Sequence, residues 1–245
     1  MSRCFGDSMR RIVIASGKGG VGRTTLTANL GIALAQMGKA TIIVDGSLTT
    51  PNLALLFKLE KVIYTLNDVL AGEATLVDVM YDGPGGVKIV PAAVTLEQIR
   101  KVRSERLQEV LRELPEATDF LLIDSPGGLR RETVSALRAG RELLLVTTPE
   151  IPAVSDALKT RLLGEFLGLK PIGAVLNRKR GEEFELAGDE IKTILNLPVL
   201  AEIPEDASVR KALRQGKPAI ELSPKSSASK AIKALAKKLV KMRVK

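Results

Sequence analysis

The chain has 245 residues, 45% of them hydrophobic and 27% charged, which excludes a disordered protein and suffices for one well-formed core. It has no histidine and one cysteine, Cys4, so histidine-based triads, imidazole general bases, an intrachain zinc site and internal disulfides are excluded, and a cytoplasmic location is expected. No apolar run approaches the ~20 residues of a membrane span, and the net charge of +9 is concentrated in residues 225–245, which hold eight basic side chains and no acidic one.

Seven unbroken apolar runs alternate with helical patterns along the chain. Continuous rather than alternating apolar runs are typical of parallel strands buried on both faces. We therefore predict one α/β fold, a doubly wound and mostly parallel sheet with helices on both faces. The expected strands are 11–16, 40–45, 87–92, 120–125, 142–148, 171–177 and 198–204. The expected helices are 25–38, 104–114, 130–139, 153–168, 184–195, 206–215 and 226–242, with short helices and turns in 58–85.

The sequence contains no internal repeat and no flexible linker long enough to separate domains. We expect a single domain over residues 1–245. Residues 1–8 are expected to form a loose N-terminal extension, and residues 225–245 a basic amphipathic helix at the C-terminus.

The glycine-rich stretch GKGGVGRT, residues 17–24, lies between the first strand and the first helix. In this context glycines let backbone N–H groups surround a phosphate at a helix N-terminus. The hydroxyl of Thr24 stands where such loops bind Mg²⁺. The residues expected to hold the phosphates are Gly17, Lys18, Gly19, Gly20, Val21, Gly22, Arg23, Thr24 and Thr25.

Lys18, just inside the first glycine, is the extra lysine of a loop that resembles the variant Walker A motif, KGGxGK[ST], of the MinD/ParA ATPases. The resemblance covers nearly the whole chain and is strongest to archaeal MinD-like members. It implies a P-loop NTPase fold of the SIMIBI type, with ATP or ADP and Mg²⁺ as cofactors. It also implies an ATP-dependent homodimer in which Lys18 reaches the nucleotide of the partner subunit, and a further protein partner.

Arg23 departs from the family pattern, which has lysine at this position. A guanidinium keeps the positive charge and binds phosphate well, but it is planar and larger than an ammonium group. Phosphoryl transfer depends on precise positioning. We therefore expect nucleotide binding to survive and hydrolysis to suffer.

The stretch DGSLTTPN, residues 45–52, resembles the family's first switch, D-x-D-x-x-x-x-N. Asp45 and Asn52 match this pattern, but Ser47 replaces the second aspartate, which in the family orients the attacking water. A serine hydroxyl cannot act as a carboxylate base at neutral pH. The alternative is that Ser47 only begins a turn. By resemblance, the catalytic candidates are Lys18, Arg23, Asp45 and Ser47.

Asp124 ends an apolar strand in FLLIDSPGG and resembles the Walker B aspartate. A carboxylate at this strand end suits Mg²⁺, so Asp124 and Thr24 are the metal candidates. The alternative is an aspartate that only caps the turn. Gly127 and Gly128 supply a turn whose amide could face a γ-phosphate.

The sequences AVLNR and IPEDASVR resemble the family's base-recognition elements. By this resemblance Asn177 would bond the adenine edge, and backbone near Pro204, Glu205 and Asp206 would flank the ring. Asp206 could also be the N-cap of the following helix. The absence of an N-K-x-D guanine motif favours ATP over GTP.

The helix expected near the C-terminus separates an apolar half from a lysine half. The apolar half comprises Ala231, Ile232, Leu235, Ala236, Leu239, Val240 and Met242. The helix could pack on the sheet with its lysines in solvent, lie on an anionic membrane, or contact DNA phosphates. A membrane contact would make the protein peripheral to the membrane.

Three functions are consistent with the sequence. The first is a MinD-like nucleotide-dependent dimerisation switch in the placement of the cell-division site or a related spatial organisation, with ATP hydrolysis weak or absent because of Arg23 and Ser47. The second is a ParA-like DNA-partitioning protein. The third is a carrier of metal or iron–sulfur clusters, which the single cysteine disfavours.

Overall fold

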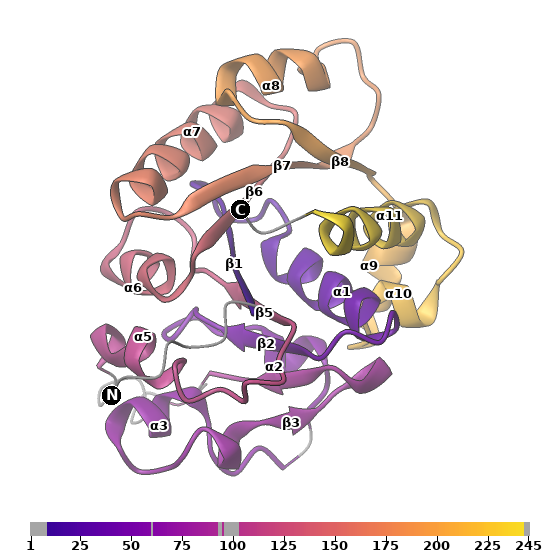
Figure 1. The fold of residues 1–245 in the computed structure, drawn as a ribbon. Coiled ribbons are helices and arrows are strands. Elements are labelled where there is room, and N and C mark those ends of the chain that lie inside the picture. Colours follow the sequence, from indigo (N-terminus) through magenta and orange to yellow (C-terminus); the bar gives the residue numbers. More distant parts are fainter. Residues whose placement is uncertain (1–8, 60, 93–94, 96–102, 243–245) are drawn as a thin grey trace.

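A computed structural model describes residues 9–59, 61–92, 95 and 103–242. Within them, eight strands form one sheet in the order β3-β4-β2-β5-β1-β6-β7-β8 (Figure 1). All neighbours are parallel except the pair β3 and β4. The strands are β1 Arg10–Ala15, β2 Thr41–Asp45, β3 Tyr81–Asp82, β4 Lys88–Val90, β5 Phe120–Asp124, β6 Glu142–Thr147, β7 Lys170–Lys179 and β8 Val199–Pro204. The expected N-terminal extension and the last three residues lie outside the described residues.

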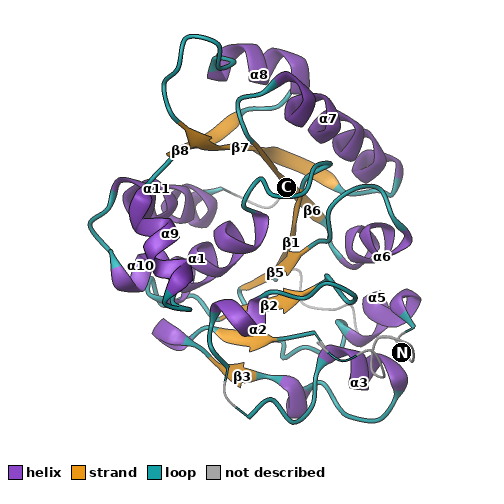
Figure 2. Ribbon diagram, turned by 180° about the vertical axis from the view of Figure 1, so that it is seen from behind, coloured by secondary structure: helices purple, strands orange, loops and turns teal. Residues whose placement is uncertain are grey.

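Helices cover both faces of this sheet (Figure 2). One core contains apolar residues of α1, α2, α10 and α11, and the other contains those of α3, α5, α6, α7 and α8. The α-helices are α1 Arg23–Ala35, α2 Leu53–Leu56, α3 Leu66–Ala71, α5 Leu107–Val110, α6 Arg131–Ala139, α7 Ile151–Phe166, α8 Gly188–Leu195, α9 Ala207–Arg214, α10 Ala219–Leu222 and α11 Ser227–Lys241. The 3₁₀ helices are η1 Val77–Val79, η2 Pro84–Gly86 and η3 Ser104–Arg106. The predicted fold class is confirmed.

Two predicted helices are shorter in the structure. The expected helix 104–114 is η3 followed by α5, which ends at Val110, and tight turns continue to Glu113. Pro115 keeps the segment from continuing as a helix after these turns, because the residue before a proline avoids helical geometry. The expected helix 184–195 begins only at Gly188, since the Glu185 carboxylate accepts hydrogen bonds from the backbone N–H groups of Arg180 and Gly181 and holds a loop there.

The region 58–85 contains α3, η1 and η2, in agreement with the predicted short helices and turns. The sequence analysis missed β3, the antiparallel strand at the sheet edge, and the four-residue helices α2 and α10. Strands and helices this short carry too few residues to show an apolar period.

Helix α11 packs against α1 and β8, beside the sheet (Figure 1). Its buried apolar residues include Ile232, Leu235 and Leu239, and Lys238 donates a hydrogen bond to the carbonyl of Leu200 at 2.7 Å. The packing alternative for this helix is therefore realised in the structure. Val240, expected on the apolar half, is instead 37% exposed. None of the helices in the described residues is long and apolar enough to cross a membrane.

Arg10, on the first strand, forms a buried ion pair with β6 and a hydrogen bond with the last helix. The Arg10 guanidinium donates to the Glu142 carboxylate at 2.7 and 2.8 Å and to the carbonyl of Leu239, near the end of α11, at 2.5 Å. It also lies 5.5 Å from the ring centroid of Phe120. Because Arg10 and Glu142 are only 6% and 8% exposed, neither charge can turn to water when its partner is removed.

We predict that Arg10→Met lowers the free energy of unfolding by about 3–5 kcal/mol, because it leaves the Glu142 carboxylate buried and uncompensated. Urea denaturation measures the loss. The matched variant Arg10→Met with Glu142→Leu removes both charges and should recover most of the stability. A loss below about 1 kcal/mol in the single variant, the value of an exposed pair, would contradict this role.

Candidate functional site

The glycine loop connects β1 to α1 and has the backbone that phosphate binding requires. Gly20 and Gly22 adopt left-handed φ values of 82° and 94°, which favour glycine. A side chain at Gly22 would collide with the amide of Asn177, whereas Gly19 and Gly20 face open space within 4 Å. The loop is thus packed on one side and open on the other, so its backbone is accessible to an anion.

Arg23 folds back onto the loop that precedes it. Its Nη1 lies 2.5 Å from the hydroxyl of Ser16, 3.2 Å from the Ser16 carbonyl and 3.3 Å from the Lys18 carbonyl. Its Nε is buried and has no hydrogen-bond partner. Burial lowers the pKa of Arg23, and the nearby Asp124 opposes this shift.

Asp124 lies at the end of β5 and contacts the start of α1. Its carboxylate accepts a hydrogen bond from the hydroxyl of Thr24 at 2.6 Å and a longer one from Thr27 at 3.5 Å. The two predicted metal ligands, Thr24 and Asp124, are therefore in direct contact. Burial, and secondly the charge of Asp45, raises the pKa of Asp124 to about 7.

Asp45 is paired with Asp124 across β2 and β5, and its carboxylate is fully buried. It accepts hydrogen bonds at 3.0–3.1 Å from the backbone N–H groups of Ser47, Asn52 and Leu53. Burial raises the pKa of Asp45 to about 6, and these three hydrogen bonds oppose the shift. Asp45 thus holds the shape of the switch-like loop 46–52, with Ser47 only 7% exposed.

The glycines after β5 bring a second loop over the first. A Cβ placed on Gly127 would lie 3.0 Å from Nη2 of Arg23 and 3.4 Å from Cα of Gly19. Gly128 has a left-handed φ of 78°, and its carbonyl accepts a hydrogen bond from Thr133 in α6. The turn therefore rests on the Arg23 guanidinium.

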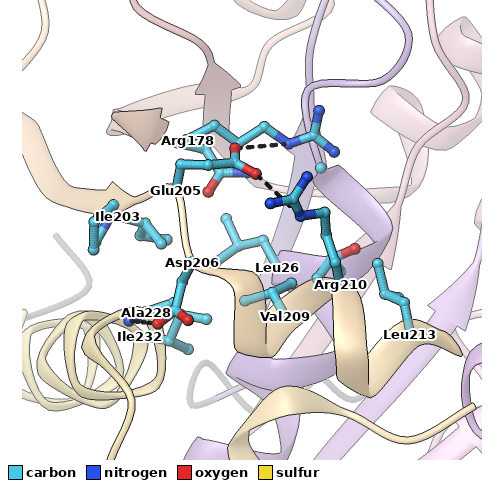
Figure 3. A pocket seen from close by; sticks show the side chains of 14 residues that line it. Leu26, Arg178, Ile203, Glu205, Asp206, Val209, Arg210, Leu213, Ala228 and Ile232 are labelled. Atoms are coloured by element: carbon cyan, nitrogen blue, oxygen red, sulfur yellow. Dashed lines mark hydrogen bonds and ion pairs between the residues drawn. The ribbon is translucent and has the colours of Figure 1, made fainter. Parts of the chain in front are cut away.

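The four predicted base-binding residues line a single cleft beside the glycine loop. Figure 3 shows Glu205 and Asp206 among the residues that line it. Side chains of α1, α9 and α11 form its apolar walls, and Gly22 and Thr25 connect it to the loop. Asn177 donates a hydrogen bond to the carbonyl of Val21 at 2.7 Å. The four residues are Asn177, Pro204, Glu205 and Asp206.

Asp206 caps two helices at the edge of this cleft. Its carboxylate accepts hydrogen bonds from Ser208 N–H at the start of α9, and from the Ser227 hydroxyl and Ala228 N–H at the start of α11. Hydrogen bonds from Ser208, above all, hold the pKa of Asp206 well below its usual range. The predicted N-cap role is confirmed, and the bond to α11 is additional.

Sequence reasoning missed two residues of the site. Ser16, the last residue before the loop, accepts from Arg23 and donates to the Lys18 carbonyl at 2.7 Å. Arg178 has a left-handed φ of 58°, which creates a bulge between β7 and β8 and places its side chain at the rim of the cleft, 3.9 Å from Glu205. Only the adjacency of Ser16 to the glycines could have suggested its role.

A phosphate-accepting loop that opens into a cleft, with a hydroxyl and a buried carboxylate at its end, defines a P-loop nucleotide-binding protein. The family model ParA, described as NUBPL iron-transfer P-loop NTPase, matches residues 8–240. The chain belongs to this ParA family of P-loop NTPases, as the resemblance predicted.

The relatives agree with this assignment. An uncharacterised ATP-binding protein of Methanocaldococcus jannaschii is 44% identical over 229 residues, which cover 94% of this chain and 87% of that protein. The septum site-determining protein MinD of Pyrococcus horikoshii, solved with Mg-ADP, is 40% identical with a TM-score of 0.92, covering 95% and 96% of the two chains. MinD in the MinC:MinD complex of Aquifex aeolicus is 30% identical with a TM-score of 0.83, covering 96% and 97%.

We predict that the buried Asp124 carboxylate makes the protein less stable as pH rises. Its unfolded pKa is about 3.9 and its folded pKa about 7, so between these values the native state binds more protons and its stability falls with pH. The free-energy difference between the parent and Asp124→Asn should therefore shift against the parent from pH 5 to pH 8. Urea denaturation without magnesium or nucleotide measures it, with exposed Asp189→Asn as the control. A difference independent of pH would contradict the prediction.

Proposed function

We propose that this protein is a MinD-like nucleotide-dependent dimerisation switch that binds ATP and ADP with Mg²⁺ and hydrolyses ATP slowly or not at all. The observation that carries the proposal is the continuity of the glycine loop with the cleft lined by Asn177 and Asp206. In this proposal the base lies in the cleft and the phosphate chain lies along the loop. The Mg-ADP bound to the Pyrococcus MinD supports the same cofactors here.

The residues of this site fit a magnesium nucleotide. Gly19 and Gly20 leave open space over the loop, and the buried Nε of Arg23 is a donor without an acceptor. Loop backbone and Arg23 would hold the phosphates, and Thr24 and Asp124 would hold Mg²⁺. A bound Mg-triphosphate would supply the phosphoryl group for transfer and a divalent charge to stabilise it.

The arrangement of Asp45 and Ser47 supports a weak hydrolase. Among the described residues, the hydrogen bonds to the Asp45 carboxylate come from backbone N–H groups of the loop that follows it and of Leu53 at the start of α2, so this carboxylate has a structural role. Ser47 can hydrogen-bond a water but cannot take its proton as a carboxylate would. Arg23 is likewise bound to carbonyls of the glycine loop. None of the four catalytic candidates is therefore positioned as a general base.

We predict that Arg23→Lys combined with Ser47→Asp raises ATP turnover by about tenfold or more, since a positioned general base contributes at least that much. Release of inorganic phosphate measures turnover. The control is Arg23→Lys with Ser47→Asn, which matches the size of aspartate without its charge and should gain much less. Equal turnover in the parent and both variants would refute the explanation of impaired hydrolysis.

We propose that Lys18 contacts a partner subunit. Its side chain is 48% exposed, and its Nζ lies at a distant 3.8 Å from the Glu150 carboxylate. The two residues line an open hollow with Phe184, which is 83% exposed. An exposed lysine beside an apolar side chain supports the proposed subunit interface, where Lys18 would reach the second nucleotide.

We predict that Lys18→Ala leaves the affinity for Mg-ADP within about twofold, because the removed contact is solvent-exposed, but weakens the ATP-dependent dimer. Sedimentation velocity with a non-hydrolysable ATP analogue measures the dimer. Lys192→Ala, on the exposed surface of α8, is the control. A dimer that is unaffected by Lys18→Ala would exclude the role of this lysine across the interface.

Helix α11 supports a contact with an anionic surface. Its apolar side is packed, while Lys230, Lys237 and Lys241 are exposed along the outer side. A cytoplasmic protein peripheral to an anionic membrane is the preferred proposal, and DNA contact in a ParA-like partitioning role is the alternative.

The MinC:MinD complex supports an additional protein partner. We do not extend the iron-transfer activity of the family description to this chain, which has one cysteine.

A further inference from the structure

The Arg23 guanidinium lies between the two loops of the site. On one side it bonds Ser16 and the Lys18 carbonyl, and on the other it contacts the turn at Gly127, where an added Cβ would lie 3.0 Å from Nη2 and 3.2 Å from Nη1. The same Cβ would lie 3.4 Å from Gly19. Arg23 and Gly127 therefore close one end of the glycine loop, against the Cα of Gly19.

The opposite end of the loop opens into the base cleft. Gly22 and Thr25 line that cleft together with Asn177, whereas Gly19 and Gly127 do not. A nucleotide whose base occupies the cleft extends its phosphates along the loop and away from it. The phosphate farthest from the base therefore approaches the end closed by Arg23.

The contacts of Arg23 at this end favour a short phosphate chain. Its acceptors are two neutral carbonyls at 3.2 and 3.3 Å and one hydroxyl, while Nε has no partner. A phosphate that meets the guanidinium from the loop side gains a charge-assisted hydrogen bond. A longer phosphate chain must also displace the guanidinium from Gly127, so that the contacts of Arg23 with this turn are lost.

We infer that Arg23 makes this site discriminate between nucleoside diphosphate and triphosphate in favour of the diphosphate. The inference rests on the proposed function, since it requires that the site bind nucleotide. The protein bound to the diphosphate is then the resting state of the switch. Binding of a triphosphate moves Arg23 out and thereby releases the turn at Gly127.

The test is isothermal titration calorimetry of the full-length chain with Mg-ADP and with a non-hydrolysable Mg-ATP analogue. We expect the parent to bind the diphosphate at least roughly tenfold more tightly, the equivalent of one charge-assisted contact. In Arg23→Lys, whose smaller head frees the space beside Gly127, the ratio should fall to within about threefold. Arg138→Lys, at the exposed end of α6, should retain the parental ratio.

Arg23→Ala provides a second readout if the lysine variant is unstable. It should bind both nucleotides more weakly yet lose the preference, because a common loss cancels in the ratio. Equal affinities in the parent, or a parental ratio retained by both Arg23 variants, would overturn the inference while leaving nucleotide binding intact. Failure of every variant and the parent to bind either nucleotide would overturn the proposed function as well.

Discussion

The site depends on the burial of two carboxylates side by side at the carboxyl edge of the sheet. Asp45 and Asp124 end adjacent strands, and their charges require compensation because water does not reach them. Each is compensated differently: Asp45 by the backbone of the loop that follows it, and Asp124 by Thr24, Thr27 and the charge of Arg23. These same bonds fix the loop 46–52 and the start of α1, so compensating the charge also shapes the site.

Arg23 connects this electrostatic arrangement to the phosphate loop. A lysine at this position would present a compact ammonium, whereas the guanidinium spans the distance from the Ser16 carbonyl to the turn at Gly127. The loops before α1 and after β5 are therefore coupled through one side chain. A change in the length of the bound phosphate chain that moves Arg23 also removes the contact that supports the second loop. A ligand that binds one arrangement of the two loops more tightly than the other shifts the population of the protein toward that arrangement.

The base cleft is coupled to the C-terminal helix in a similar way. Asp206 lines the cleft and holds the first turn of α11, and Arg10 holds its last turn through Leu239. The helix is thus fixed at both ends while Lys230, Lys237 and Lys241 remain exposed to solvent. Any surface that these lysines bind is recognised by a helix that is already folded and docked, so binding would not require the helix to order first.

The sequence by itself determined the parallel strands of the sheet, the order of the longer helices and the identity of the nucleotide-binding loop. Unbroken apolar runs specify parallel strands through burial, and closely spaced glycines specify a tight phosphate loop through their freedom in φ. Only the tertiary structure decided where the Arg23 head lies, that Asp45 is occupied by its own loop, and that Arg178 sits at a bulge. These features arise from contacts between residues as far apart as Arg23 and Gly127, and neither local propensity nor periodicity encodes such a contact.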